Sequence, residues 1–322
     1  MKVSAVVTTK PWTVELRELT VAEPGPDEVV VRVTHSWISP GTEGSFIRGE
    51  RLAGDTPLAP TDPSPFPLVT GYQKVGVVTW VGQNVKNFAI GERVFATVSR
   101  TDGLFFATGG HVSPAITSTH QLWKIPEGTL PIEAFSGLVL TQVGYNCGIR
   151  PALSPGDGAI VIGDGLVGQW AAQTLAERGA SVTLLGHHDE RLAKFTRGTV
   201  TTEPESIAKG QSVLVDTVGD LGTVYALLPR LRRDSHFVSA GFYGHEGKID
   251  LQRLRNQEIT VHTPAGWTTP RMDVTLDWVA QGKLTTLPLI THRFPVADAT
   301  EAFDLFLHRR APSLGILLEW PQ

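Results

Sequence analysis

The sequence predicts an α/β protein with two parts, a mostly β module followed by a doubly wound parallel sheet. In the first third of the 322 residues, short β-branched runs alternate with glycine and proline, at Val29 to Val33, Val75 to Val81 and Arg93 to Val98. From about Gly156 the pattern changes to apolar strand, glycine turn and amphipathic helix, repeated. Strands that alternate with helices are typical of a parallel sheet with helices on both faces.

The expected elements of the second part follow one another closely. They are the strands Ala159 to Ile162, Val182 to Leu185, Val213 to Val215 and His236 to Ala240, and the helices Leu166 to Arg178 and Gly222 to Leu231. Further on we expect a helix that ends near Gly282, an amphipathic helix over Ala297 to Leu307 and a terminal strand over Leu314 to Glu319. Earlier in the chain, Leu52 to Pro67 is rich in proline and aspartate and predicts a surface loop.

Composition excludes several classes of function. The formal net charge is −4, which gives no electrostatic reason to expect nucleic acid as a partner. The single cysteine, Cys147, rules out an intramolecular disulfide and a multi-cysteine zinc site. The amino terminus lacks the apolar core of a secretion signal, and no run approaches the roughly 20 apolar residues that span a bilayer. We therefore expect a cytoplasmic protein that binds no membrane.

A glycine motif, Gly163-Asp164-Gly165-Leu166-Val167-Gly168, lies between the first expected strand and helix of the second part. In this context the first glycine permits a tight turn, the second lets the backbone approach a pyrophosphate, and the third lets the helix pack on the strand. The motif thus predicts a Rossmann dinucleotide site. The residues assigned to it are Gly163, Gly165, Leu166, Val167 and Gly168, with Gly241 after the strand expected at His236 to Ala240.

The end of the second expected strand favours NADP(H), with NAD left open. Sites that prefer NAD usually carry Asp or Glu there, about 20 residues after the motif. This chain has Gly186, followed by His187, His188 and, slightly further on, Arg191. Small and basic groups leave room for a 2′-phosphate and can neutralise it. The neighbouring acids Asp189 and Glu190 also fit a solvated helix start.

Several short segments, in order, resemble the medium-chain dehydrogenase/reductase superfamily over nearly the whole chain. They include Pro24 to Val31, Ile38 to Glu43, Gly71 to Val78, Gly91 to Val94, the glycine motif, Gln281 to Lys283, His292 to Pro295 and Glu301 to Phe303. The resemblance implies a GroES-like β domain plus a Rossmann domain, which we place at 1–139 with 267–322 and at 140–266. It also implies an NAD(P)-dependent enzyme with a small-molecule substrate. Because relatives are often dimers or tetramers, a homodimer stays open.

The positions of the zinc ligands in this superfamily are changed. Zinc-dependent members have a Cys-Gly-Thr-Asp-like sequence where this chain has Pro40-Gly41-Thr42-Glu43, and a Gly-His-Glu-like sequence where it has Gly71-Tyr72-Gln73. The third ligand position falls near Val139, and the four-cysteine zinc lobe is absent. We therefore expect no metal. The chain is most similar to the zinc-lacking branch typified by bacteriochlorophyllide a dehydrogenase, although Gln73-Lys74 and the proline-rich loop depart from it.

Without zinc, another donor must stabilise the developing alkoxide. Tyr72, at a ligand position, and Lys74, two residues on, are candidate acids, and the resemblance matches Thr42 to a proton-relaying hydroxyl and Glu43 to a carboxylate behind the ligands. Each also has a structural interpretation, in which Tyr72 packs against the cofactor, Thr42 caps a helix over Gly44 to Arg48, and Glu43 is a buried ion-pair partner. His111, in Gly109-Gly110-His111, is another candidate with a structural alternative.

Three functions remain open at this point. The first is hydride transfer between nicotinamide and a secondary alcohol or ketone. The second is zinc-free, NADPH-dependent reduction of an activated C=C bond or a quinone, which needs less help from an acid. The third is NADP(H) binding without catalysis.

Overall fold

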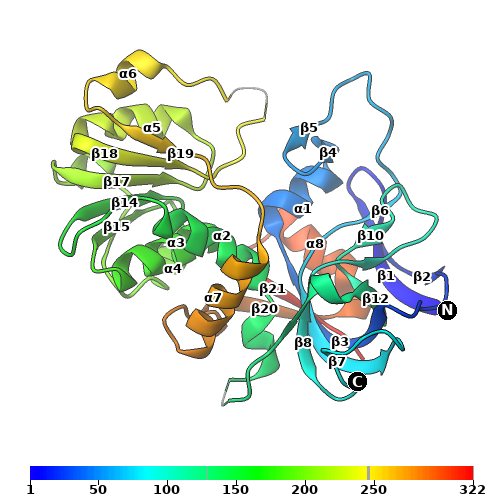
Figure 1. Cartoon of the computed structure of the whole chain (residues 1–322). Helices are drawn as coiled ribbons and strands as arrows, with labels where there is room; N and C mark the ends of the chain where they lie inside the picture. Colours follow the sequence, from blue (N-terminus) through cyan, green and yellow to red (C-terminus); the bar gives the residue numbers. More distant parts are fainter. Residues whose placement is uncertain (129, 245–246, 322) are drawn as a thin grey trace. The chain divides into compact units, whose positions relative to one another are not determined.

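The computed structural model describes residues 1–128, 130–244 and 247–321, which form two compact units (Figure 1). The first unit comprises Met1–Val139 and Ile290–Gln322, and the second comprises Leu140–Leu289. Over the described residues, no helix has the length and apolar character needed to cross a bilayer.

Mostly antiparallel sheets dominate the first unit, with β20 and β21 as a parallel pair. One sheet has the order β13-β8-β7-β3-β21-β20, with β12 also on β3, and another has the order β11-β1-β2, with β6 also on β1. The strands are β1 (Lys2–Lys10), β2 (Thr13–Thr20), β3 (Glu28–Ile38), β4 (Arg51–Ala53), β5 (Thr56–Pro57), β6 (Leu68–Val69), β7 (Lys74–Val81), β8 (Arg93–Ala96), β9 (Ser99–Arg100), β10 (Thr108–Gly109), β11 (Val112–Ser113), β12 (Ala115–Ser118), β13 (Leu122–Lys124), β20 (Ile290–Pro295) and β21 (Gly315–Glu319). The helices are α1 (Pro40–Ile47) and α8 (Ala299–Leu307).

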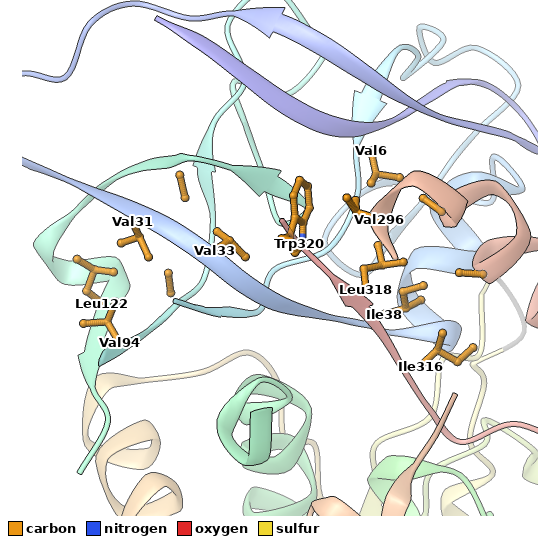
Figure 2. Close-up of a cluster of buried hydrophobic side chains, with 14 of the residues drawn as sticks. Val6, Val31, Val33, Ile38, Val94, Leu122, Val296, Ile316, Leu318 and Trp320 are labelled. Carbon is orange, nitrogen blue, oxygen red and sulfur yellow. The ribbon is translucent and has the colours of Figure 1, made fainter. Parts of the chain in front are cut away.

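The valine run in β3 explains why this strand lies at the centre of the unit. Val29, Val31 and Val33 belong to one buried cluster, while Val30 belongs to a second cluster on the other face. A strand buried on both faces has no polar alternation, as its sequence shows. Figure 2 shows the first cluster, in which β3, β8, β13 and β21 bring their apolar side chains together. Ile38 at the end of β3 and Ile47 at the end of α1 both belong to this cluster, so the cluster connects these two elements.

The second unit contains a six-stranded parallel sheet in the order β16-β15-β14-β17-β18-β19. Its strands are β14 (Gly158–Ile162), β15 (Ser181–Leu185), β16 (Thr199–Thr201), β17 (Gln211–Asp216), β18 (Leu231–Ser239) and β19 (Thr260–His262). Its helices are α2 (Leu138–Ile149), α3 (Leu166–Glu177), α4 (Asp189–Leu192), α5 (Leu221–Leu227), α6 (Leu251–Arg255) and α7 (Thr269–Ala280).

Helices cover both faces of this parallel sheet. Ala159 and Val161 of β14 pack with residues of α2 and α3, whereas Ile160 and Ile162 pack with residues of α5 and α6. The order is that of the doubly wound Rossmann fold, in which ligands bind at the carboxyl ends of the strands where the winding reverses. Here the reversal lies between β14 and β17. The predicted α/β class, with a β module and a doubly wound sheet, is confirmed.

Some predicted elements differ from the structure. The segment 52–67 is not a loop throughout, because β4 and β5 pair as a short antiparallel ribbon at its start. The helix expected over Gly222 to Leu231 ends at Leu227, and a short 3₁₀ turn containing Pro229 follows. Proline has no N–H group to continue the helical hydrogen bonds. The chain therefore enters β18 at Leu231, five residues before the strand start expected at His236.

The second boundary between the two units also lies later in the sequence than expected. We placed it at 267, whereas the second unit extends to Leu289. The intervening residues pack on that unit: Trp278 of α7 contacts the ring of Tyr145, and the carbonyl of Thr285 accepts a hydrogen bond from Trp170. These contacts involve aromatic side chains that are distant in sequence, so a local sequence pattern does not predict them.

Candidate functional site

The glycine motif forms a tight turn from β14 into α3, at the carboxyl edge of the parallel sheet. Gly163 has φ +111°, a conformation that favours glycine, and a Cβ atom on Gly168 would lie 1.8 Å from the carbonyl oxygen of Gly163. Both glycines are thus required by the turn itself. Gly165 is different, because a Cβ atom there would meet no atom within 4 Å.

Open space at Gly165 coincides with the amino terminus of a helix. Gly165 is the N-cap residue of α3, and no described side chain caps that end. The first backbone N–H groups of a helix, including those of Leu166 and Val167, attract anions. The turn therefore fits a pyrophosphate, and these residues would hold one through backbone N–H groups.

Gly241 lies at the same edge of the sheet, just beyond β18. Its N–H group donates to the carbonyl of Asp216, and a Cβ atom on it would lie 1.9 Å from the nitrogen of Gly219. Close packing of two loops is sufficient to explain this glycine. A contact with the cofactor remains a prediction.

Asp164, inside the glycine motif, brings a carboxylate to the end of β15. Its Oδ2 accepts hydrogen bonds from the N–H groups of His187 and His188 and contacts Nδ1 of His188 at 2.9 Å. Burial alone would raise the pKa of Asp164, but these hydrogen bonds outweigh it and lower the pKa. A Cβ atom on Gly186 would lie 2.5 Å from that of Asp164. Gly186 therefore occupies the usual acidic position because the carboxylate arrives from the motif instead.

This arrangement changes the surroundings of the predicted 2′-phosphate site. His188 and Arg191 both contact Asp164, the latter through Nη1 and Oδ1 at 3.4 Å. His187 is exposed and directs only its backbone N–H group at Asp164. Two of the three basic residues expected at the phosphate, His188 and Arg191, thus already contact a carboxylate, which the sequence analysis missed.

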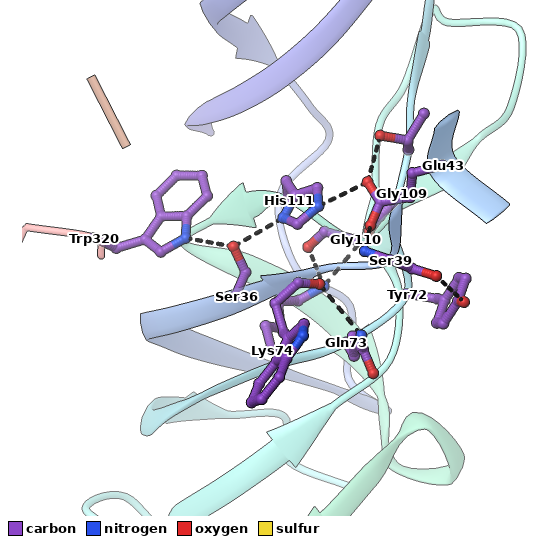
Figure 3. Close-up of polar contacts among 12 residues, drawn as sticks. Ser36, Ser39, Glu43, Tyr72, Gln73, Lys74, Gly109, Gly110, His111 and Trp320 are labelled. Carbon is purple, nitrogen blue, oxygen red and sulfur yellow. Dashed lines mark hydrogen bonds and ion pairs between the residues drawn. The ribbon is translucent and has the colours of Figure 1, made fainter. Parts of the chain in front are cut away.

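In the first unit, Tyr72 and Ser39 form a pair of hydroxyl groups. The Tyr72 hydroxyl donates to Oγ of Ser39 at 2.7 Å (Figure 3). Ser39 directly precedes α1, and Tyr72 follows Gly71, which has φ +83°. Burial raises the pKa of Tyr72, and hydrogen bonding with Ser39 and Thr42 only partly opposes this rise. Tyr72 therefore stays protonated at neutral pH and is a hydrogen-bond donor. The sequence analysis did not include Ser39.

Thr42 and Glu43 lie in the first turns of α1. The helix begins at Pro40, so Thr42 is inside it and does not cap a helix over Gly44 to Arg48, as the structural alternative supposed. Proline is well suited to this position, where its missing N–H group costs no hydrogen bond. Glu43 is fully buried, and its carboxylate accepts from the N–H group of Ser39 and the hydroxyl of Thr70.

Lys74 is buried at the start of β7, and its amine is surrounded by backbone carbonyl groups. Nζ donates to the carbonyl oxygens of Thr97 at 2.9 Å and Gly110 at 2.8 Å. Burial lowers the pKa of Lys74 to about 7, while the carbonyl oxygens around it favour the ammonium form. These contacts tie β7 to the loops beside it. They give no support to Lys74 as the acid that meets a substrate.

The three positions compared with zinc ligands hold Pro40, Tyr72 and Val139. Pro40 starts α1, and Val139 is buried in α2. Across residues 1–128, 130–244 and 247–321, no three His, Cys, Asp or Glu side chains are grouped as a metal site.

Comparisons with known proteins agree with this architecture. Residues 25–127 match the alcohol dehydrogenase GroES-like domain. The 2-desacetyl-2-hydroxyethyl bacteriochlorophyllide A dehydrogenase of Cereibacter sphaeroides is 26% identical, with 99% of each chain covered. The L-threonine 3-dehydrogenase of Deinococcus radiodurans is 23% identical, with 96% of this chain and 94% of the relative covered. These matches agree with the resemblance to the medium-chain dehydrogenase/reductase superfamily, which extends over nearly the whole chain.

Solved structures show the same fold. A putative zinc-binding dehydrogenase from Sinorhizobium meliloti 1021, bound to NADP, has a TM-score of 0.82 at 18% identity, with 99% of each chain covered. A short chain alcohol dehydrogenase from Escherichia coli CFT073, complexed with NADH, has a TM-score of 0.83 at 21% identity, again with 99% of each covered. The expected GroES-like and Rossmann domains are confirmed, and the findings support an oxidoreductase of the medium-chain dehydrogenase type.

Proposed function

We propose that this oxidoreductase transfers hydride between a nicotinamide dinucleotide and a secondary alcohol or its ketone, without zinc. The observation that carries the proposal is the pair of hydroxyl groups on Tyr72 and Ser39, 2.7 Å apart. Tyr72 is at one position of a zinc ligand in related enzymes, and Ser39 is next to another, at Pro40. Hydrogen-bond donors can stabilise a developing alkoxide as a metal does.

The chain's own residues supply the remaining chemistry. Bound nicotinamide supplies or accepts the hydride, and the backbone at Gly165 to Gly168 holds the pyrophosphate. In ketone reduction the Tyr72 hydroxyl donates its proton to the substrate oxygen, and the tyrosinate that remains regains a proton from solvent. In alcohol oxidation the steps run in reverse: Tyr72 first gives its proton to solvent, and the tyrosinate then takes the proton of the substrate hydroxyl. Ser39 and Thr42 orient that hydroxyl, in keeping with their hydrogen bonding to Tyr72.

The substrate class is tested by a panel in which chemistry, and not size, is varied. Matched secondary alcohols, their ketones and the corresponding enones and quinones should be assayed with both nicotinamide cofactors. Turnover confined to the alcohol and ketone pairs is expected. Turnover confined to enones or quinones would favour reduction of a conjugated bond, and tight cofactor binding with no turnover of any compound would refute an enzymatic role.

We propose NADP(H) as the cofactor, and we propose that Asp164 reduces the preference for NADP(H) over NAD(H). His187, His188 and Arg191 bring basic groups to the end of β15, where Asp164 fills the space beside Gly186. A carboxylate beside a 2′-phosphate is unfavourable because the two negative charges repel each other. Asp164 also contacts His188 and Arg191, which reduces their ability to bind the phosphate. A modest preference for the phosphorylated cofactor is therefore proposed.

Asp164→Asn should strengthen NADPH binding relative to NADH by roughly 5-fold to 30-fold, because it removes one negative charge and frees Arg191. The matched control is Asp189→Asn, which removes an exposed acid from the start of α4. Calorimetric dissociation constants for both cofactors measure the effect. Weaker NADPH binding in Asp164→Asn, with NADH unchanged, would show that Asp164 does not face the 2′ position.

A further inference from the structure

A buried series of hydrogen-bonded side chains extends from Trp320, directly after β21, to Glu43 in α1 (Figure 3). Nε1 of Trp320 donates to Oγ of Ser36 at 2.9 Å, and Ser36 lies 2.8 Å from Nδ1 of His111. Nε2 of His111 lies 2.9 Å from Oε2 of Glu43. Ser36, His111 and Glu43 have no exposed surface. Polar groups this deeply buried are costly unless their partners are well placed.

Two donors of known direction determine which groups donate and which accept in this series of hydrogen bonds. The N–H group of Ser39 donates to Oε1 of Glu43, and the hydroxyl of Thr70 donates to Oε2. With both oxygens of the Glu43 carboxylate accepting hydrogen bonds, we assign the proton of the contact with His111 to Nε2, which this arrangement requires. Both the neutral ring with its proton on Nε2 and the imidazolium satisfy this requirement.

Ser39 connects this series of hydrogen bonds to Tyr72. Its backbone N–H group is held by Glu43, and its hydroxyl accepts the hydrogen bond of Tyr72. Gly71 allows His111 to reach Glu43 at this point, because a Cβ atom on residue 71 would lie 2.7 Å from Nε2 of the imidazole. The position of the Tyr72 hydroxyl therefore depends, through Ser39 and Glu43, on His111.

We infer that His111 is a positioning residue that holds the Ser39 hydroxyl against Tyr72 by way of the Glu43 carboxylate. The inference rests on the proposed function, in which Tyr72 exchanges the proton with the substrate. A shorter side chain at position 111 that still contacts Ser36 but cannot reach Glu43 would remove one hydrogen-bond donor from the Glu43 carboxylate. Buried polar networks that lose one member relax toward other hydrogen-bond arrangements, and a displacement of about 1 Å costs up to 100-fold in rate.

Two substitutions at His111 distinguish its hydrogen bond to Glu43 from its contribution to packing. In His111→Asn the amide nitrogen lies near the place of Nδ1, so it faces Ser36 and cannot reach Glu43. In His111→Gln the amide nitrogen lies near the place of Nε2 and can still donate to Glu43. We expect kcat to fall about 10-fold to 100-fold in His111→Asn with little change in KM, and His111→Gln to recover most of that loss.

A readout that does not need turnover follows the Tyr72 hydroxyl itself. The chain has four tyrosines, so 3-fluorotyrosine gives a small set of ¹⁹F resonances, and Tyr72→Phe assigns the one from Tyr72. In the protein without substrate, we expect His111→Asn to move this resonance and leave the others, and His111→Gln to leave all of them. A Tyr72 resonance that is unchanged in His111→Asn, or that moves equally in both variants, would overturn the inference.

If His111→Asn fails to fold, Ser36→Ala takes its place, since it keeps the imidazole but removes the hydroxyl beside Nδ1. The Tyr72 resonance should then move in the same way but less, and an unchanged resonance would again overturn the inference. The two proposals fail separately. If Tyr72→Phe keeps full turnover while His111→Asn still moves the resonance, Tyr72 is not the acid, yet His111 positions it.

Discussion

A protein carrying Gly165→Asp is expected to lose measurable binding of both NADPH and NADH, a loss of more than about 100-fold in affinity. Gly165 is the N-cap residue of α3, and the space beyond its Cα is open. A carboxylate there would cap the helix and take the place of the pyrophosphate, and its negative charge would repel the incoming phosphate groups. Calorimetry with both cofactors measures the loss.

Two matched variants identify the cause of that loss. Gly165→Ala adds a Cβ atom that meets nothing within 4 Å, so the protein should fold normally and bind the cofactor only somewhat less tightly. Gly165→Asn has the size of aspartate without its charge and should lie between the two. Unchanged affinity in Gly165→Asp would show that the motif is a turn and no binding site.

Tyr72→Phe is expected to lower kcat for secondary alcohols and ketones by about 100-fold to 10,000-fold, the usual contribution of a general acid or base. The ring that packs in the unit is kept, and the hydroxyl that donates to Ser39 is removed. Cofactor affinity should not change, because the glycine motif is untouched. Steady-state kinetics, with deuterated nicotinamide to follow hydride transfer, measure the effect.

Tyr225→Phe is a suitable control, because it removes a tyrosine hydroxyl that accepts from the N–H group of Asp250 in the second unit. It should keep normal turnover. A Tyr72→Phe protein that retains its rate on ketones within about 3-fold would exclude Tyr72 as the acid. An equal loss on ketones and enones would point to a structural role instead.

Local patterns in the sequence predicted most of the fold. The apolar strand, the glycine turn and the amphipathic helix from Ala159 to Glu177 are all specified by neighbouring residues, so their positions were predicted within a residue or two. The turn at Pro229 and the β4–β5 ribbon are also local, but their signals were outweighed by a helical pattern and by proline content.

The candidate site depended on pairs that the sequence does not reveal. Asp164 and His188 are 24 residues apart, Ser39 and Tyr72 are 33 apart, and Glu43 and His111 are 68 apart. Each pair joins segments that are distant in sequence and that the fold brings together, and the periodicity of a sequence carries no information on such contacts. One signal was available: glycine at position 186, where an acid is usual, indicates that another group occupies that space.

The central claim is hydride transfer without zinc, and the zinc content of active protein tests it most directly. The protein should be purified without added metal, analysed for zinc, and assayed before and after treatment with a strong chelator. The account predicts less than about 0.1 zinc per chain and the same turnover after chelation, because Pro40, Tyr72 and Val139 offer no thiolate or imidazole. About one zinc per chain, with turnover that is lost on its removal and restored by its return, would contradict the account.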